Sequence, residues 1–242
     1  MTSLEARNQG LAQKFKRRVQ GVPRRLKELE RSLALLAVFR ALGWHRSVSV
    51  GAPVDADGEP LPWLTYPAIA WLEHYVHPSH VIYEYGAGYS TLWFAKRAAK
   101  VHSIEHNAAW VARLRNCLPS NADLTLAAAD EGEYSDRVTS PYARSIAAFP
   151  DRYFDIILID GMERGGCAVL APPKLRPDGI LIFDNSDRPG HHAVLRRLRE
   201  DGFGRVDFIG NIPGYWNPGC TSVLFRQAAP FLRSDAPPFQ GY

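Results

Sequence analysis

Residues 81–90 read Val-Ile-Tyr-Glu-Tyr-Gly-Ala-Gly-Tyr-Ser and lead into a helix-like stretch, Thr-Leu-Trp-Phe-Ala-Lys-Arg-Ala, at residues 91–98. An apolar run that stops at Gly-x-Gly and passes into a helical pattern is typical of a parallel strand followed by a helix beneath a ligand. Gly86 allows a backbone conformation that a Cβ would forbid, and Gly88 lets the main chain approach a ligand. We therefore predict a cofactor-binding loop, with a glycine turn of no functional weight as the alternative.

Three polar residues accompany this loop. Glu84 lies inside the predicted strand, where a carboxylate costs desolvation free energy unless a donor or a cation satisfies it. Its position predicts a positively charged or amine-bearing ligand. Ser90 and Thr91 are suited to cap the new helix, whose free N–H groups face the same ligand.

A second acid follows nineteen residues after Gly86, where the apolar run Val-His-Ser-Ile ends in Glu105. In doubly wound sheets, an acid at the end of the second strand accepts hydrogen bonds from ribose hydroxyls. The pattern predicts a nucleoside cofactor and leaves NAD open. Two features distinguish the chain from the dinucleotide fingerprint: Thr91 replaces the third glycine, and that fingerprint does not require Glu84.

Together these stretches resemble the first two motifs of class I S-adenosylmethionine-dependent methyltransferases, Glu-Tyr-Gly-Ala-Gly-Tyr-Ser at residues 84–90 and Ser-Ile-Glu-His at residues 103–106. The resemblance continues through Phe-Asp-Ile-Ile-Leu-Ile-Asp-Gly at 154–161, the run Leu-Arg-Pro-Asp-Gly-Ile-Leu-Ile-Phe-Asp-Asn-Ser-Asp-Arg at 175–188, and Thr-Ser-Val-Leu-Phe at 221–225, and so covers roughly residues 60–226. It implies S-adenosylmethionine as the cofactor. The candidate cofactor-binding residues are Glu84, Tyr85, Gly86, Ala87, Gly88, Ser90, Thr91, Glu105, His106, Asp130 and Asp160. Asp130 matches the family's adenine-binding acid by position, and a cap of a turn or helix is its alternative role.

Apolar runs alternate with helical patterns along the chain, which predicts an α/β fold with a Rossmann-like, doubly wound, seven-stranded and mostly parallel sheet, its last strand antiparallel. The expected strands are residues 81–85, 101–105, 123–129, 154–159, 180–183, 206–209 and 221–225. The expected helices are residues 3–20, 23–42, 67–76, 107–118, 164–174 and 190–200. We divide the chain into a basic helical appendage at residues 1–48, a methyltransferase-like domain at 49–227 and a proline-rich tail at 228–242.

Composition sets further limits. The chain has 242 residues, of which 46% are hydrophobic and 22% charged, enough for one substantial domain. Three widely spaced cysteines indicate neither a disulfide framework nor a zinc site. With no signal peptide or transmembrane run, we expect a cytoplasmic protein.

The net charge of +4 is unevenly distributed, since residues 1–45 hold ten Lys and Arg against three Glu and the remainder carries −3. Leu26, Leu29, Leu33 and Leu36 recur at helical spacing, so this basic segment has one apolar face. Such a helix suits peripheral contact with an anionic membrane at its inner face. Alternatively, the leucines pack on the catalytic domain or on a second subunit in a homodimer. Because the residues after 45 carry a net negative charge, we do not expect a nucleic-acid substrate.

Two arrangements are available for deprotonating a hydroxyl acceptor. Asp160, Asp184 and Asn185 match, in order and strand-end placement, the metal ligands of catechol O-methyltransferase-like enzymes, which implies a Mg²⁺ site. Position 163, where those enzymes carry a lysine, is Glu163. The other arrangement is a protein base, for which the candidates at the predicted sheet edge are Asp160, Asp187, His106, His191 and His192. We name Asp160, Asp187 and His191 as the catalytic candidates.

The acceptor is expected to be a small-molecule or glycan hydroxyl. Residues 161–163 lack the Pro-Pro-aromatic run of amino-methylating nucleic-acid enzymes, and no Pro-Cys dipeptide marks a cytosine-C5 enzyme. Trp63 and Tyr66 are candidate substrate residues, with burial in the core as the alternative. Two rival functions stay open: an NAD(P)-dependent oxidoreductase, and a non-catalytic module that binds S-adenosylmethionine.

Overall fold

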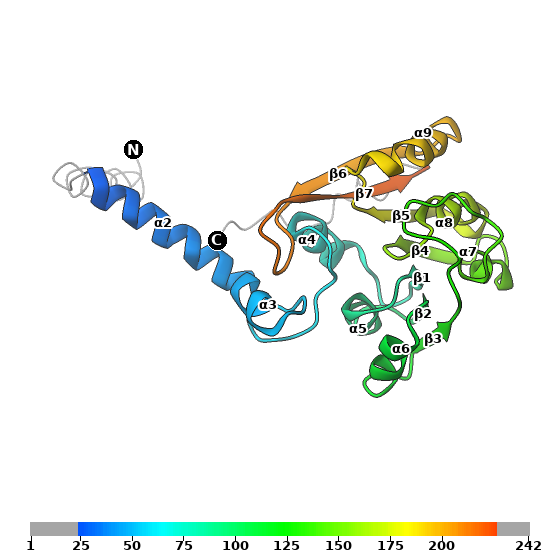
Figure 1. Cartoon of the computed structure of the whole chain (residues 1–242), viewed down its shortest axis with the longest axis horizontal. Coiled ribbons are helices and arrows are strands. Elements are labelled where there is room, and N and C mark those ends of the chain that lie inside the picture. The colour runs from blue at the N-terminus through cyan, green and yellow to red at the C-terminus, as the bar shows by residue number, and fades with distance from the viewer. Residues whose placement is uncertain (1–23, 227–242) are drawn as a thin grey trace, which may run out of the picture.

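The computed structural model describes residues 24–226, which form a twisted seven-stranded sheet with helices on both faces and one long helix projecting away from it (Figure 1). The strands are β1 Val81–Tyr85, β2 Lys100–Glu105, β3 Ala122–Leu126, β4 Phe154–Ile159, β5 Leu175–Asp184, β6 Gly204–Gly210 and β7 Gly219–Phe225. The helices are α2 Arg24–Ala41, α3 Trp44–Val50, α4 Tyr66–Tyr75, α5 Tyr89–Ala95, α6 Ala108–Arg115, α7 Pro141–Arg144, α8 Arg164–Leu170 and α9 His192–Glu200, with 3₁₀ turns η1 Ser145–Ala148, η2 Pro172–Lys174 and η3 Pro189–His191.

The strand order is β3-β2-β1-β4-β5-β7-β6. The first five strands pair in parallel, and β7 runs antiparallel to both β5 and β6. The predicted α/β class, the seven strands and the antiparallel last strand are therefore confirmed. The order reverses between β1 and β4, so the carboxyl ends of these strands flank the crevice where such sheets bind ligands.

Two predicted strand bounds are wrong by several residues. β5 begins at Leu175, not at residue 180. β3 stops at Leu126, not at residue 129. It is an edge strand whose only neighbour, β2, ends at Glu105, and the Glu105 carbonyl accepts the last hydrogen bond of the ladder from the Ala127 N–H. Beyond that point the chain has no strand to pair with.

The sheet separates two apolar cores. Ile156 and Leu158 of β4 pack with α4 and α5 on one face, while Ile157 and Ile159 pack with α7, α8 and α9 on the other. This alternation explains why residues 156–159 of β4 are a continuous apolar run, since both faces of the strand are buried there.

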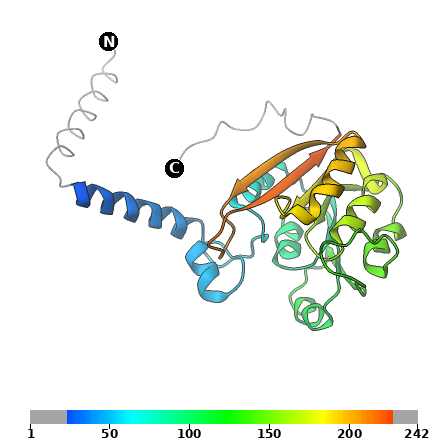
Figure 2. The ribbon, with the colours of Figure 1, turned by 45° about the horizontal axis from the view of Figure 1, so that its top comes forward.

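Helix α2 contacts the core only near its C-terminal end, where Phe39 packs against the cluster that contains Trp44, and Figures 1 and 2 show the helix pointing away from the sheet. Leu26, Leu29, Leu33 and Leu36 are each 46–55% exposed, so they do not pack on the sheet and its helices in the part of the chain described. The helix predicted at residues 3–20 lies outside the described residues. The proline-rich tail predicted at residues 228–242 lies outside them as well. The proposed boundary at residue 48 falls within α3.

No helix among residues 24–226 combines the length and apolar character needed to cross a membrane.

Candidate active site

The glycine loop joins β1 to α5 and needs its first glycine. Gly86 has φ 96°, and a Cβ there would lie 2.5 Å from the Asp160 carbonyl oxygen at the end of β4. Gly88 is extended, with φ −174°, and a Cβ there would meet nothing closer than the Ser90 hydroxyl at 4.0 Å. Gly86 is thus required by the fold, whereas the open space beside Gly88 belongs to the cavity above the loop.

Glu84 braces this loop from behind. It is fully buried, and its Oε2 accepts hydrogen bonds from the hydroxyls of Thr91 and Ser103, the latter at 2.7 Å. The Thr91 hydroxyl in turn accepts the Gly88 N–H at 3.0 Å. Burial raises the pKa of Glu84 to about 7, although these hydroxyls favour the carboxylate.

Three predicted cofactor residues do not line the loop cavity. Glu84 is buried behind the loop, where hydroxyls bond its Oε2 and its Oε1 has no partner within the described residues. Thr91 is fully buried as the helix cap described above. Tyr85 points into the opposite core, where its hydroxyl donates to the Ala143 carbonyl at 2.8 Å.

Glu105 closes the far side of the loop at the end of β2. Its Oε1 accepts the backbone N–H groups of His106 and Asn107 at 2.9 and 2.8 Å, and His106 Nδ1 lies 2.9 Å away. Within the described residues, Oε2 has no partner. The carboxylate is thus fixed by backbone, with one oxygen left for a ligand in the adjoining cavity.

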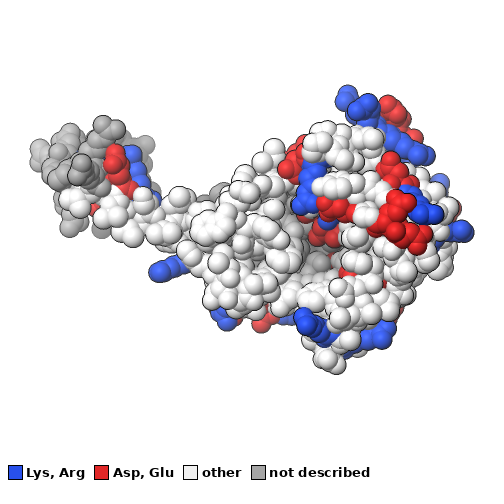
Figure 3. Space-filling model, viewed as in Figure 1, with Lys and Arg blue, Asp and Glu red and all other residues white. Residues whose placement is uncertain are grey.

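That cavity, which we call the loop cavity, measures about 360 Å³, at the small end of the range for ligand pockets. It is lined by Gly51, Ala52, Pro53, Trp63, Gly86, Ala87, Gly88, Tyr89, Ser90, Glu105, His106, Trp110, Glu133, Asp160, Gly161, Met162 and Arg164. Three of these carry carboxylates and one a guanidinium. Figure 3 shows acidic side chains gathered in and beside a hollow on this side of the molecule.

A second cavity of about 520 Å³, the outer cavity, shares four residues with the first: Trp63, Glu133, Asp160 and Arg164. Its other lining residues are Asp184, Asn185, Asp187, Arg188, Ile212, Tyr215, Asn217, Pro218 and Gly219. These are mostly polar, and the rings of Trp63 and Tyr215 lie 5.4 Å apart at its edge. The two cavities therefore meet at a common wall at the ends of β4 and β5.

Some of the predicted catalytic and substrate residues line the two cavities, and another is buried in the apolar core. Asp160 lines both cavities and Asp187 the outer one. Trp63 also lines both, fixed by a 2.8 Å hydrogen bond from its indole N–H to the Pro213 carbonyl. Tyr66 is instead part of the apolar core, as its alternative role predicted.

His191 does not line either cavity. It is 1% exposed and packs between the rings of Tyr134 and Phe183, and its Nε2 has no partner within the described residues. Burial lowers its pKa to about 4. The prediction of a catalytic base at His191 is wrong because the imidazole is enclosed by aromatic side chains.

Arg164, the first residue of α8, was missed by the sequence analysis. Its Nη2 lies 3.0 Å from Asp160 Oδ1 and 3.7 Å from Glu133 Oε2. Its Nη1 donates to the Asp184 carbonyl at 2.8 Å and to Asn185 Oδ1 at 3.1 Å. No sequence signal marked it, because Asp160 follows strand β4 and Arg164 begins α8, so their contact depends on the turn between them.

The predicted Mg²⁺ site is not supported. Asp160 and Asn185 present their oxygens to Arg164, so a guanidinium occupies the place expected for the ion. The Asp184 carboxylate is turned to the Thr221 hydroxyl, which donates to its Oδ1 at 2.6 Å. Among residues 24–226, no group of three or more His, Cys, Asp or Glu is arranged to hold a metal.

Both acids at this wall have raised pKa values. Burial raises the pKa of Asp160, and the Arg164 guanidinium opposes that rise. Burial also raises the pKa of Asp184, and the neighbouring Asp160 carboxylate adds to it. A carboxylate with a raised pKa is a stronger proton acceptor when it is ionised.

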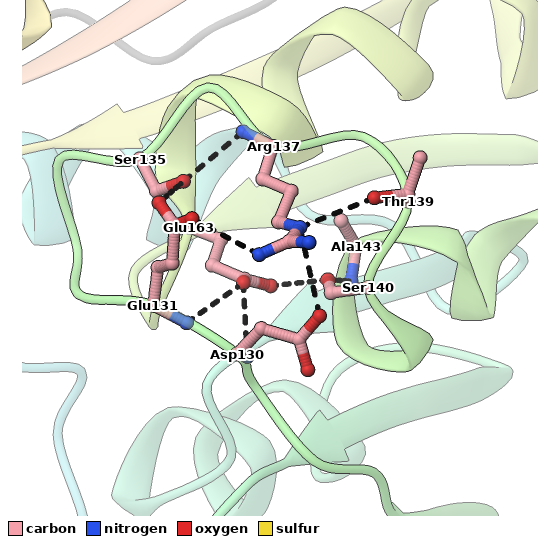
Figure 4. Close-up of polar contacts among 8 residues, drawn as sticks. All are labelled: Asp130, Glu131, Ser135, Arg137, Thr139, Ser140, Ala143 and Glu163. Atoms are coloured by element: carbon pink, nitrogen blue, oxygen red, sulfur yellow. Dashed lines mark hydrogen bonds and ion pairs between the residues drawn. The ribbon is translucent and has the colours of Figure 1, made fainter.

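Asp130, the predicted adenine contact, lies outside the loop cavity. Its carboxylate is 3.6 Å from Arg137, and its N–H donates to Glu163 Oε1 at 3.0 Å (Figure 4). Glu163 is fully buried at φ 47° and also binds Glu131 N–H and the Ser140 hydroxyl. Position 163, where catechol O-methyltransferase-like enzymes carry a lysine, thus holds a glutamate that anchors residues 130–140. This segment contains Glu133, which lines both cavities.

Comparison with known proteins gives structural matches only. No family model matches the chain, and neither does any curated protein. A methyltransferase from Geobacter sulfurreducens aligns with a TM-score of 0.48 at 15% identity, over 85% of this chain and 98% of its own. An O-methyltransferase from Bacillus cereus in complex with SAH aligns with a TM-score of 0.48 at 16% identity, over 70% and 86%.

A third match, spermidine synthase from Thermotoga maritima, has a TM-score of 0.48 at 13% identity over 64% of this chain, which spans only 56% of that one. Similarity this low carries no activity from those proteins to this chain. The fold itself rests on the strand order, and the function on the two cavities.

Proposed function

We propose that this chain is an S-adenosylmethionine-dependent methyltransferase that methylates a hydroxyl of a small molecule or sugar. The observation that carries the proposal is the joint lining of the loop cavity by the glycine loop, Glu105 and Asp160. These groups come from the ends of β1, β2 and β4, where doubly wound sheets bind nucleosides.

The charge of the loop cavity favours a cationic donor. Glu105, Glu133 and Asp160 line it, while its one arginine, Arg164, is already bonded to several oxygens. A sulfonium is attracted to such a lining, whereas a pyrophosphate is repelled. This is the main physical argument for S-adenosylmethionine over NAD(P).

We assign Glu105 as the residue that accepts hydrogen bonds from the ribose hydroxyls of the donor. Its Oε2 is the acceptor left after Oε1 is occupied by two backbone N–H groups and His106. A carboxylate fixed in this way presents a defined acceptor to two vicinal hydroxyls.

The acceptor is assigned to the outer cavity, because its wall is shared with the loop cavity. Asp187, Arg188 and Asn217 supply hydrogen-bonding groups there, and Trp63 and Tyr215 supply aromatic faces. This combination suits a polyhydroxylated molecule with both polar and apolar faces. Binding both substrates across one wall brings the reacting atoms together, which is the main requirement of a direct displacement.

In the proposed reaction, the acceptor hydroxyl gives its proton to the Asp160 carboxylate, and its oxygen forms a bond to the methyl carbon. The carbon–sulfur bond breaks with its electron pair retained by sulfur, which yields a neutral thioether and a methyl ether. Asp160 suits this role because it lines both cavities and its pKa is raised by burial.

Calorimetric titration with S-adenosylhomocysteine and with NAD⁺ tests the donor, and mass detection of S-adenosylhomocysteine in the presence of sugars and small phenols tests turnover. We expect the homocysteine nucleoside to bind and NAD⁺ not to. Asp160→Asn is expected to retain that binding and to lower kcat by about 100-fold. Tighter binding of NAD⁺ would favour the oxidoreductase, and binding without turnover on any acceptor would favour the non-catalytic module.

A further inference from the structure

Arg164 lies at the centre of the wall between the two cavities and is surrounded by oxygen atoms. Its Nε donates to the Gly161 carbonyl at 2.9 Å, and its Nη1 donates to the Asp184 carbonyl and Asn185 Oδ1 at 2.8 and 3.1 Å. Its Nη2 lies 3.0 Å from Asp160 Oδ1. The side chain is only 7% exposed.

These oxygens come from the ends of two strands that are distant in sequence. Asp160 and Gly161 follow β4, and Asp184 and Asn185 end β5, where Asn185 takes a left-handed conformation with φ 54°. Carboxylate, amide and carbonyl oxygens are also the ligands that a hard divalent cation prefers. The chain therefore builds an oxygen-lined cage and fills it with a guanidinium from its own helix α8.

We propose that Arg164 supplies, in place of a divalent cation, the fixed positive charge at which the acceptor oxygen is held for methyl transfer. This inference rests on the proposed function, since it assigns the acceptor oxygen to the wall shared by the two cavities. It makes the reaction independent of added metal, and it identifies Arg164 as a residue that touches the acceptor. A guanidinium suits this role because it stays charged at every physiological pH and its planar donors contact several oxygens at once.

A metal ion in addition to Arg164 is disfavoured on two grounds. Asp160 Oδ1 and Asn185 Oδ1 already bond to the guanidinium, and Asp184 Oδ1 bonds to Thr221. A divalent ion among the same oxygens would also lie close to the guanidinium charge, and like charges at such distances repel strongly in a buried site.

The charges around the cage predict what removal of Arg164 does. Four carboxylates, from Glu133, Asp160, Asp184 and Asp187, line the outer cavity, and Arg164 and Arg188 oppose them. Without Arg164, the excess of carboxylates grows and the oxygen cage is empty. The variant should therefore gain a site for a divalent cation that the native chain does not have.

The test is Mn²⁺ binding, followed by calorimetry and by the electron paramagnetic resonance of the ion, on purified full-length protein with neither donor nor acceptor present. We expect no Mn²⁺ binding to the native protein, and a new site in Arg164→Ala. The double variant Arg164→Ala with Asp160→Asn is the matched control and should lose that site. Arg164→Lys keeps the charge and should not gain one.

Turnover provides the second readout. EDTA should leave native activity unchanged, Arg164→Ala should lower kcat by about 100-fold, and Arg164→Lys should recover part of that loss. Native Mn²⁺ binding that Asp160→Asn removes would overturn the inference, as would EDTA inactivation of the native enzyme or an Arg164→Ala protein that folds and binds no Mn²⁺. If Arg164→Ala does not fold, the native protein and the lysine variant still decide it. Mn²⁺ binding requires neither donor nor acceptor. The inference about Arg164 can therefore fail or succeed independently of the proposed methyl transfer.

Discussion

The two cavities hold their functional groups by different means. On the loop side, Glu105 is fixed by the N–H groups of His106 and Asn107, and the glycine loop by the Thr91 hydroxyl and by Trp110, whose indole N–H donates to the Ala87 carbonyl at 2.7 Å. On the outer side, Arg164 alone connects Asp160, the Asp184 carbonyl and Asn185. The loop side is thus held by several separate hydrogen bonds between side chains and backbone, and the outer side by the one side chain of Arg164.

This difference has a consequence for mutations. One substitution on the loop side removes only part of a set of separate hydrogen bonds, whereas a cluster joined by one guanidinium loses its organisation with that residue. Three substitutions on the loop side test the contrast, in addition to the Arg164 variants.

The largest effect is expected at Gly86, where the two sides touch. Gly86→Ala would force φ 96° on a residue with a Cβ and place that Cβ 2.5 Å from the Asp160 carbonyl. Strain and overlap together should lower the free energy of unfolding by about 4 kcal/mol, measured by urea denaturation. Both cavities should be distorted, so binding of S-adenosylhomocysteine should be lost as well.

Gly88→Ala is the matched control, because its backbone is extended and its Cβ has room. We expect unchanged stability and about tenfold weaker binding of S-adenosylhomocysteine, since the added methyl occupies ligand space. Equal destabilisation by the two substitutions would contradict the assignment of Gly86 to the fold and Gly88 to the ligand.

The next effect concerns Glu84 and pH. Burial raises its pKa from 4.5 to about 7, so the folded state binds a proton that the unfolded state releases between these values. Stability should therefore fall as pH rises from about 4.5 to 7, by up to about 3 kcal/mol from this group. In Glu84→Gln that contribution disappears, and the difference in unfolding free energy between pH 5 and pH 8 should shrink accordingly.

Glu84→Gln also tests whether Glu84 supports the glycine loop through hydrogen bonds or contacts the ligand directly. The glutamine carbonyl still accepts the Thr91 and Ser103 hydroxyls, so binding of S-adenosylhomocysteine should change less than twofold. A large loss of affinity without loss of stability would restore the original prediction that Glu84 contacts the cofactor.

The smallest effect is expected at Glu105. Glu105→Gln keeps an acceptor for the ribose but removes its charge, which should weaken S-adenosylhomocysteine binding by about tenfold at unchanged stability. Asp130→Asn is the control outside the loop cavity and should bind as the native protein does. Both are measured by calorimetric titration.

The part of the fold and site that sequence predicts is the part encoded locally. Strand β4 is apolar at every position except Asp155, and the Gly-x-Gly turn is marked by its own residue types, so both were placed correctly. Glu105 ends β2 by the same local logic. The edge strand β3 was extended too far because its end depends on where its neighbour stops.

The outer side was harder to predict because its contacts join distant segments. Nothing near Asp184 or Asn185 in sequence indicates that Arg164 fills the space between them and Asp160. Likewise, Glu163 anchors residues 130–140 through hydrogen bonds between segments that are distant in sequence. His191 is enclosed by the rings of Tyr134 and Phe183, which are also distant from it or from each other in sequence. The polar residue types at these strand ends suggested a metal site, and a buried arginine provides the charge instead.

The central claim is that the donor nucleoside lies in the loop cavity with its reactive sulfur toward the wall shared with the outer cavity. A crystal structure of the complex with S-adenosylhomocysteine tests it most directly. The account predicts ribose hydroxyls on Glu105 Oε2 and the sulfur facing Asp160 and Arg164. A loop cavity left empty at saturating ligand, or a sulfur directed away from that wall, would contradict it.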